Sequence, residues 1–438
     1  MELDRRGLLA AGGAVVAAST ALSACESGEA RPRRRFRDAG AWRGVRDQFA
    51  LSDRDIHMSA MLISSHPRIV REAIERHRRE LDANPVRYLE ANNGPRRAET
   101  LAAAARYLGM DGDDIALTDS TTMGIGLAYN ALRLRPGQEI LTTDEDYYVT
   151  HEAVRTAAGR AGASVRQIPL FDRVEAATPE DLARRVVGAV GPRTRVLALT
   201  WVHSSTGLKL PAAAIAQGLS EINAGRDEDD QVIFGLDAVH GFGNQDFDFP
   251  GLGCDILMAG CHKWLFGPRG TGILAASRRG WQAMRPIIPS FTDDGVFSAW
   301  LEQRDPQGAT TASRMTPGGF KAFEHYWALA QAFEFHQEIG KARVARRTAE
   351  LAGQLKAGLA TLRGVSLRTP RPEALSAGIV SFDVDGHAPE AVVSRLRDRG
   401  VIGSVAPYAT PHVRLTPSIR NTPGEVDAVL AEIREIAA

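Results

Sequence analysis

Beyond about residue 51, short runs of aliphatic and β-branched residues alternate with longer stretches of mixed polarity. The apolar runs are typical of buried strands, which we expect over 114–119, 138–144, 194–202, 231–239, 254–260 and 271–277. Stretches of helical character, such as 95–109 and 151–163, lie between most of them. This alternation predicts an α/β domain with a mostly parallel sheet, which we place over residues 51–320.

The end of the chain has a different pattern. Residues 320–362 form one long helix-rich stretch. After it we expect strands over 377–386 and 412–418 and helices over 389–400 and 422–438. The pattern predicts a second, smaller α+β domain over residues 321–438.

The first 25 residues have the layout of an export signal, with a charged start, an apolar middle from residue 8 to about 22 and a small-residue end. The pair Arg5-Arg6 makes this segment resemble a twin-arginine (Tat) signal. The end, Leu22–Cys25, resembles a bacterial lipobox, in which the cysteine is lipidated. A plain cleaved signal without lipid and an ordinary N-terminal helix are the alternatives. We expect Tat export to the periplasm or a lipid anchor, with residues 26–50 as a linker and arm.

Composition adds two constraints. The 438 residues are 44% hydrophobic and 24% charged, and Lys+Arg and Asp+Glu both number 53, so the chain lacks the basic excess of a nucleic-acid-binding protein. Cys254 and Cys261 flank one predicted strand, and about 3.3 Å per residue places them too far apart for a disulfide. We therefore expect two buried thiols and no metal cluster, which fits a protein that folds before it is exported.

Candidate chemistry gathers after the strands, because ligands of an open α/β sheet bind beyond the carboxyl ends of its strands. Strand 114–119 runs into Ser120, Thr121 and Thr122 at a helix start, where hydroxyl and N–H groups can hold an anion. Two tyrosines, Tyr147 and Tyr148, follow strand 138–144, and either ring could stack on a flat ligand or pack in the core.

Three further strands end in chemically active residues. Strand 194–202 is followed by Ser204, strand 231–239 contains Asp237 with His240 just beyond it, and strand 254–260 leads into His262 and Lys263. A lysine here either extends to the surface or lies in a dry pocket, where its pKa falls and the amine attacks carbonyls. An acid, a lysine and an anion site are the parts that pyridoxal 5′-phosphate (PLP) requires.

The same segments resemble the class V aminotransferase family of fold-type I PLP enzymes, which includes cysteine desulfurases and isopenicillin N epimerase. The resemblance runs from about residue 55 to the C-terminus and rests on DSTTMGIGLAYNAL, TTDEDYY, WVHSSTGLKLP, DAVHGFG, GCHKWLFGPRGTG, TPGGFKAFE and RLTPSIRNTPGEVD. It implies a large domain with a seven-stranded, mostly parallel sheet flanked by helices, and a smaller C-terminal domain.

The resemblance also implies roles for matching residues. Lys263 would form the Schiff base with PLP and take part in catalysis with Tyr147 and His240. Asp237 would pair with the pyridine nitrogen, and His240 would lie near the ring oxygen.

The phosphate of PLP would be held by Thr121, Thr122 and His262, by the same resemblance. Tyr147 would stack on the cofactor ring, with Tyr148 as the alternative.

Three roles concern the substrate and a second subunit. Ser204 stands where many relatives have an asparagine that contacts the cofactor oxygen. Arg414 would bind the substrate α-carboxylate, a task suited to a bidentate guanidinium. Thr316 would reach the partner's phosphate across a homodimer interface.

One departure narrows the activity. Cysteine desulfurases need a nucleophilic cysteine shortly before the carboxylate-binding arginine, and residues 400–414 contain none. The combination of WVHSSTG, TPGGF and two tyrosines is more similar to the isopenicillin-N-epimerase-like branch. It is also similar to Tat-exported periplasmic PLP enzymes that modify a glutamate on the siderophore pyoverdine.

We therefore expect an exported PLP enzyme that acts at the α-carbon of an amino acid or peptide-like substrate, with membrane contact only through its signal or lipid anchor. Epimerisation, transamination and decarboxylation stay open, as does a siderophore-modifying activity. A non-catalytic PLP-fold binding protein is the alternative of another class. A P-loop or nicotinamide enzyme is disfavoured, because GPRGTG is not followed by Lys-Ser/Thr and no G-x-G-x-x-G opens the first βα unit.

Overall fold

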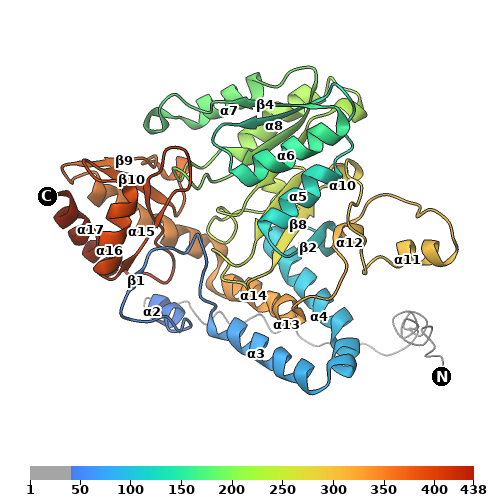
Figure 1. The fold of residues 1–438 in the computed structure, drawn as a ribbon, viewed down its shortest axis with the longest axis horizontal. Coiled ribbons are helices and arrows are strands. Elements are labelled where there is room, and N and C mark those ends of the chain that lie inside the picture. The colour runs from blue at the N-terminus through green and yellow to red at the C-terminus, as the bar shows by residue number, and fades with distance from the viewer. Residues whose placement is uncertain (1–40) are drawn as a thin grey trace, which may run out of the picture.

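The computed structural model describes residues 41–438 and is built around a seven-stranded sheet with the order β2-β8-β7-β6-β5-β3-β4 (Figure 1). The strands are β2 (Ile115–Thr118), β3 (Glu139–Thr143), β4 (Ser164–Ile168), β5 (Thr194–Thr200), β6 (Ile233–Asp237), β7 (Ile256–Gly260) and β8 (Gly272–Ala276). Strands β3 to β7 run parallel, and β8 pairs antiparallel with both β2 and β7. The predicted α/β fold with a mostly parallel sheet is confirmed.

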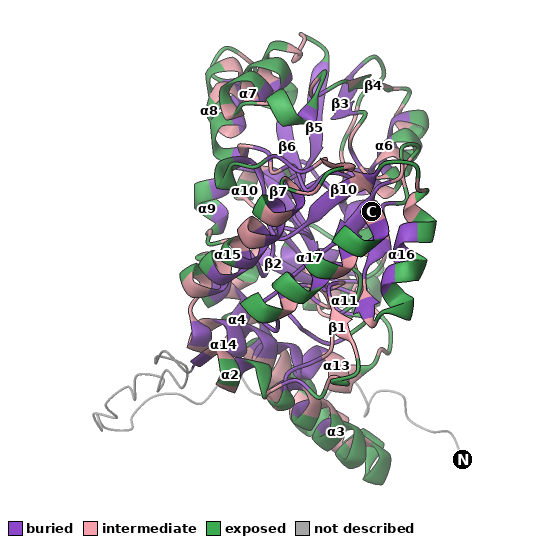
Figure 2. Ribbon diagram, turned by 90° about the vertical axis from the view of Figure 1, so that its left-hand side faces the viewer, coloured by how far each residue is buried: buried purple, intermediate pink, exposed green. Residues whose placement is uncertain are grey.

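Successive residues of the central strands serve two separate cores, because side chains alternate between the faces of a sheet. Leu197 and Leu199 pack in one cluster with residues of α4 (Pro85–Leu108), α7 (Pro179–Gly188) and α8 (Ala212–Asn223). Val196 and Ala198 pack in the other with α5 (Thr121–Ala131) and α6 (Tyr148–Ala161). Burial on both faces explains the continuous apolar runs of these strands, which are buried throughout (Figure 2).

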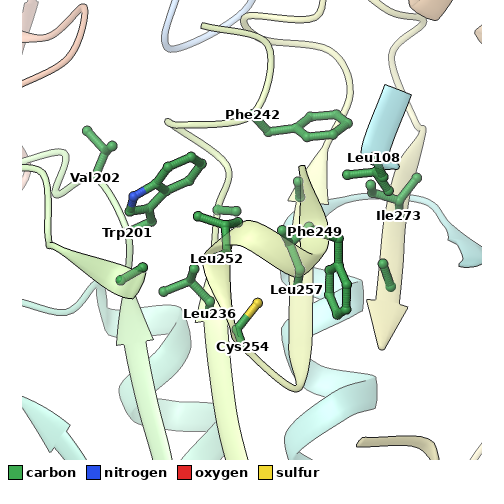
Figure 3. Close-up of a cluster of buried hydrophobic side chains, with 14 of the residues drawn as sticks. Leu108, Trp201, Val202, Leu236, Phe242, Phe249, Leu252, Cys254, Leu257 and Ile273 are labelled. Atoms are coloured by element: carbon green, nitrogen blue, oxygen red, sulfur yellow. The ribbon is translucent and has the colours of Figure 1, made fainter. Parts of the chain in front are cut away.

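Large side chains fill the core beside the ends of β6 and β7. Trp201, Phe242 and Phe249 lie around Leu236, Leu257 and Cys254 (Figure 3). Cys254 and Cys261 are both buried and free, as predicted.

A smaller antiparallel sheet follows in the order β12-β13-β10-β9, with β9 (Val365–Leu367), β10 (Val380–Val384), β12 (Ser404–Val405) and β13 (Val413–Leu415). It packs with α15 (Lys341–Leu359), α16 (Pro389–Asp398) and α17 (Pro423–Ala437), as the shared core shows. Strand β1 (Ile56–His57) pairs with β11 (Val401–Ile402), so the start of the described chain lies against this C-terminal unit. The predicted domain boundaries themselves stay a prediction.

The helix-rich stretch is divided into α13 (Phe323–Trp327), α14 (Leu329–Ile339) and α15. Gly340, at φ +96°, separates the last two. Helices α13 and α14 pack on α3 (Arg68–Ala83) and α4 (Figure 1). Short helices are α2 (Ala41–Arg46), α9 (Phe249–Leu252), α10 (Arg278–Gln282), α11 (Asp294–Leu301) and α12 (Ala312–Met315).

The N-terminal predictions fall mainly outside the described residues. The signal, with Arg5, Arg6 and Cys25, and the first part of the linker belong to residues 1–40. Helix α2 lies in the stretch predicted as linker and arm, and its Val45 is buried in a cluster with Phe266 and Phe335. Among the helices of residues 41–438, none has the length and apolar character that crossing a bilayer requires.

The turn after β5 connects the two sheets. Thr369 Oγ1 donates to the carbonyl oxygen of Thr206 at 2.6 Å, and Ser381 Oγ donates to that of Ser205 at 2.7 Å. Gly207 has φ +74°, and a Cβ there would stand 2.4 Å from the carbonyl oxygen of Ile379. The turn is therefore docked closely on the C-terminal unit.

This docking makes Gly207→Ala a sensitive test of the fold. The substitution adds left-handed strain of about 1–2 kcal/mol and an overlap with the Ile379 carbonyl that forces the backbone to move. We expect a total loss of roughly 3 kcal/mol or more in the free energy of unfolding, measured by urea denaturation. Gly137→Ala is the matched control, because Gly137 has φ +82° but no atom within 4 Å of its added Cβ. Equal losses in the two variants would show that the turn is not tightly docked.

Candidate active site

Asp237 is the last residue of β6 and is only 3% exposed. Burial raises the pKa of its carboxyl group to about 6, against the opposing effects of the Val239 N–H and of Lys263. The Val239 N–H donates to Oδ1 at 3.0 Å. Within the described residues Oδ2 accepts no hydrogen bond, so it is available to a donor such as a protonated ring nitrogen.

Lys263 lies three residues after the end of β7, which pairs with the strand that ends in Asp237. Burial lowers the pKa of its amine to about 8, although the Asp237 carboxylate acts in the opposite direction. Arg414 adds a second, smaller lowering influence. A fraction of this amine is therefore uncharged and nucleophilic near neutral pH.

Lys263 also differs from every other lysine of the chain. The ammonium groups of the others donate to protein oxygens, which belong to Gln245 for Lys209, Tyr326 for Lys321, Tyr107 and Phe247 for Lys341, and Pro370, Arg371 and Ser376 for Lys356. The amine of Lys263 donates to none of the described residues. It is the lysine most ready to react with a carbonyl.

His240 and two histidines near it, His203 and His262, have buried ring nitrogens without a partner among the described residues. These atoms are Nε2 of His203, Nδ1 of His240 and Nδ1 of His262. Burial lowers the pKa of His240 well below its ordinary value and also lowers that of His262, so burial favours the neutral form of both rings. Unpaired buried polar atoms are rare in proteins, and a group of them points to a bound molecule.

The start of α5 lies against the same residues. Ser120 Oγ caps the helix by accepting from Met123 N at 3.1 Å, and Thr121 Oγ1 accepts from Gly260 N at 2.8 Å. A Cβ on Gly260 would meet Thr121 Oγ1 at 2.8 Å and the His262 ring at 3.1 Å. Only glycine allows this close approach. Thr121, His262 and the free N–H groups of a helix start thus surround a site suited to phosphate, whereas Thr122 is exposed.

Arg414 is brought to the same place from β13 of the smaller sheet and is 2% exposed. Its Nε donates to Ser404 Oγ at 3.1 Å, Nη1 to the carbonyl oxygen of Ser204 at 2.6 Å and Nη2 to that of Val405 at 3.2 Å. Burial lowers the pKa of the guanidinium to about 10. Among the described residues no carboxylate forms an ion pair with it, so a buried positive charge is left for an anionic ligand.

The two candidate tyrosines take different positions. Tyr147 is partly buried at the start of α6, with its ring centroid 5.7 Å from that of Tyr408, whereas Tyr148 is 62% exposed. Tyr147 is therefore the one placed among the other candidate residues. Ser204 Oγ lies 2.8 Å from the Tyr408 hydroxyl, so this serine contributes its carbonyl to Arg414 and its side chain to Tyr408.

Sequence reasoning assigned no role to Tyr408, His203 or Asp146. Asp146 is buried and accepts from Thr143 N at 2.9 Å and from Thr200 N at 2.6 Å, which ties the loop before Tyr147 to β5. The acidic run before Tyr147 is the sequence feature that could have indicated Asp146. Tyr408 lies in residues 400–414, and no local pattern there marks it as a site residue.

Thr316 does not join this group through its hydroxyl. Its Oγ1 donates to the carbonyl oxygen of Ala312 at 3.0 Å and accepts from Leu117 N at 3.3 Å, within its own chain. The contact with a partner's phosphate would need a second copy and a different hydroxyl orientation. It stays a prediction.

Together these residues fit PLP. Lys263 would hold its aldehyde carbon, Asp237 its ring nitrogen, and the Thr121–Gly260–His262 group its phosphate. The unpaired nitrogens of His203 and His240 would lie toward its polar substituents. The fit rests on the orphaned atoms and on the close approach at Gly260.

Comparison with known proteins agrees with this arrangement. Residues 64–405 match the model of the family described as aminotransferase class V. The chain is 25% identical over 398 residues to isopenicillin N epimerase of Streptomyces clavuligerus, covering 88% of this chain and 96% of that protein. It is 27% identical over 349 residues to the isopenicillin N epimerase of Amycolatopsis lactamdurans, covering 78% and 85% of the two chains.

Cysteine desulfurases are also among the similar proteins. That of Klebsiella pneumoniae subsp. pneumoniae is 24% identical over 367 residues, covering 80% of this chain and 85% of that protein. The solved structure of a C-DES variant with glycine covalently linked to its PLP cofactor superposes with a TM-score of 0.79 at 23% identity, covering 89% and 99% of the chains. This structural likeness shows the fold.

The pKa of Lys263 leads to a test of covalent loading. Apo-protein is mixed with PLP, trapped with borohydride and analysed by peptide mapping. Because only the uncharged amine reacts, the initial rate of labelling should rise about tenfold between pH 7 and pH 9 and then level off. In Asp237→Asn the midpoint should move to lower pH, since the Asp237 carboxylate raises the pKa of Lys263.

Lys263→Ala should lose the label, and Lys209→Arg, which leaves the site intact, should retain it. A wild-type rate that still rises steeply above pH 10 would contradict a lowered pKa. Label on another lysine would refute the assignment of Lys263.

Proposed function

The chain belongs to the class V aminotransferase family of PLP-dependent enzymes, and we propose that it acts at the α-carbon of an amino acid or amino-acid-like group, as an aminotransferase or an isopenicillin N epimerase-like enzyme. The observation that supports this most directly is the pairing of a free, partly uncharged Lys263 with a buried Arg414 that has no acidic partner among the described residues. The Lys263 amine can react with a carbonyl and accept a proton, and the Arg414 guanidinium can bind a carboxylate.

Each of these residues would have a separate role in the reaction. Bound PLP draws electrons from the α-carbon of an attached amine, which weakens the bonds of that carbon. Arg414 would bind the α-carboxylate through its unused N–H groups and orient the substrate. The Lys263 amine, with a pKa of about 8, would accept the α-proton and return it. Asp237 would supply negative charge at the ring nitrogen.

The fate of the proton defines the activity. Its return to the opposite face of the α-carbon gives epimerisation, and transfer to the cofactor gives transamination. Loss of the carboxylate instead gives decarboxylation, and a siderophore-modifying activity remains a further candidate. The two isopenicillin N epimerases favour epimerisation within the proposal.

Desulfurase activity is a weaker candidate despite the similar desulfurases. Cys254 and Cys261 are buried, and burial raises the pKa of both thiols far above neutral pH. A desulfurase needs an accessible thiolate to take up sulfur. The described loop before Arg414 offers Tyr408 instead of a cysteine. Intact Lys263 and Asp237 also argue against the non-catalytic PLP-binding alternative.

A homodimer is part of the same proposal. Large exposed apolar side chains between residues 291 and 320, on α11 and in the segments before and after it, support it, namely Phe291, Phe297, Trp300, Leu301 and Phe320. Such a group of large exposed apolar residues is typical of an interaction surface. Light scattering of the PLP-bound protein measures its mass, which should be that of two chains.

Solvent exchange tests the proposed chemistry. The holoenzyme is incubated in D₂O with free L- and D-amino acids and short peptides, and the α-proton is followed by NMR. We expect α-deuterium exchange with at least one substrate, and none in Lys263→Ala. Inversion, keto-acid formation and CO₂ release distinguish the three outcomes. A protein that binds PLP but exchanges no α-proton and forms neither keto acid nor CO₂ would support the binding-protein alternative.

Export through the Tat pathway is the second element of the proposal, supported by Arg5-Arg6 and the apolar stretch after them. In a bacterial host, the double variant Arg5→Lys/Arg6→Lys should remain in the cytoplasm, because the pathway reads the arginine pair. The control Arg33→Lys/Arg34→Lys changes a neighbouring pair outside the signal and should be exported normally. Unchanged periplasmic yield of the first variant would refute Tat export.

A further inference from the structure

Tyr408 reaches from the smaller sheet into the candidate active site, although the family resemblance assigns it no role. It lies on the loop between β12 and β13, and its hydroxyl is 2.8 Å from Ser204 Oγ, on the turn after β5. Its ring lies beside that of Tyr147, with centroids 5.7 Å apart. Burial raises the pKa of the phenol, so Tyr408 acts as a neutral hydrogen-bonding group.

Ser204 links this tyrosine to the arginine that is expected to bind carboxylate. The Ser204 side chain meets Tyr408, and its carbonyl oxygen accepts from Arg414 Nη1 at 2.6 Å. One residue therefore holds both groups, so a movement of Tyr408 is transmitted to the acceptor that orients the guanidinium.

The donors of Arg414 show what this orientation achieves. A guanidinium has five N–H donors. Nε, Nη1 and Nη2 each use one of them, on Ser404, Ser204 and Val405. One N–H remains on each Nη atom. Because the group is planar, the three protein acceptors fix the plane of the guanidinium, and the remaining N–H groups lie in that plane, where a carboxylate can accept from them.

We propose that Tyr408 is a positioning residue for the substrate carboxylate, which acts by holding Ser204 and through it the orientation of Arg414. The proposal rests on the proposed function only in assuming a substrate with an α-carboxylate. The hydrogen bond between Tyr408 and Ser204 also joins the loop of the smaller sheet to the larger sheet, so the carboxylate site is complete only when the two units are in this contact.

A simple carboxylate separates this role from catalysis. Propionate has a carboxylate but no amino group, and its dissociation constant for the holoenzyme is measured by calorimetry. Loss of one buried hydrogen bond should weaken propionate binding about fivefold in Tyr408→Phe and about equally in Ser204→Ala. The double variant should be no weaker than either single variant, because both remove the same contact. Arg414→Gln should abolish binding.

Thr410→Ala is the matched control, since Thr410 is exposed on the same loop and no described residue forms a hydrogen bond with its hydroxyl. It should bind propionate as the wild type does. For a reacting amino acid, Tyr408→Phe should raise KM more than it lowers kcat. The absorbance of bound PLP should be unchanged in Tyr408→Phe and in Thr410→Ala.

Unchanged propionate affinity in Tyr408→Phe, or independent, additive losses in the double variant, would overturn the proposal. The result is distinguishable from a failure of the proposed function. If no amino acid exchanges its α-proton but propionate binding follows the expected pattern, the proposed function fails and the role of Tyr408 stands.

Discussion

The site depends on keeping a lysine amine partly uncharged next to a carboxylate. Attraction to Asp237 favours the charged amine, and burial favours the uncharged one. Burial has the larger effect, so the pKa of Lys263 falls to about 8. The same burial raises the pKa of Asp237 to about 6, which leaves it ionised at neutral pH. The apolar cores on both faces of the sheet exclude the water that would otherwise cancel these shifts.

The other constraint is that the site belongs to two units. Lys263, Asp237 and Thr121 come from the larger sheet, and Arg414 from the smaller one. The turn after β5 joins them, because the carbonyl oxygens of Ser204, Ser205 and Thr206 each accept a hydrogen bond from the C-terminal unit. These hydrogen bonds hold the C-terminal unit, and with it Arg414, against the larger sheet that carries Lys263.

The local sequence pattern did not predict features that depend on contacts with distant parts of the chain. Strand β4 was not predicted, since its residues SVRQI are polar and only partly buried at the edge of the sheet, where an apolar run is not required. Thr121 and Thr122 are alike in sequence, but only the first meets Gly260. Tyr408 gained its place from Ser204, about two hundred positions away.

The sequence by itself determined the α/β fold and the candidate lysine and acid, because strand period and the residues after strand ends are local properties. The candidate arginine came from the resemblance to the family. It could not show which lysine amine lacks a partner, how far burial shifts each pKa, or that Tyr408 and Arg414 share Ser204. Those features depend on residues far apart in the chain, whose distances and exclusion from water exist only once both sheets have packed.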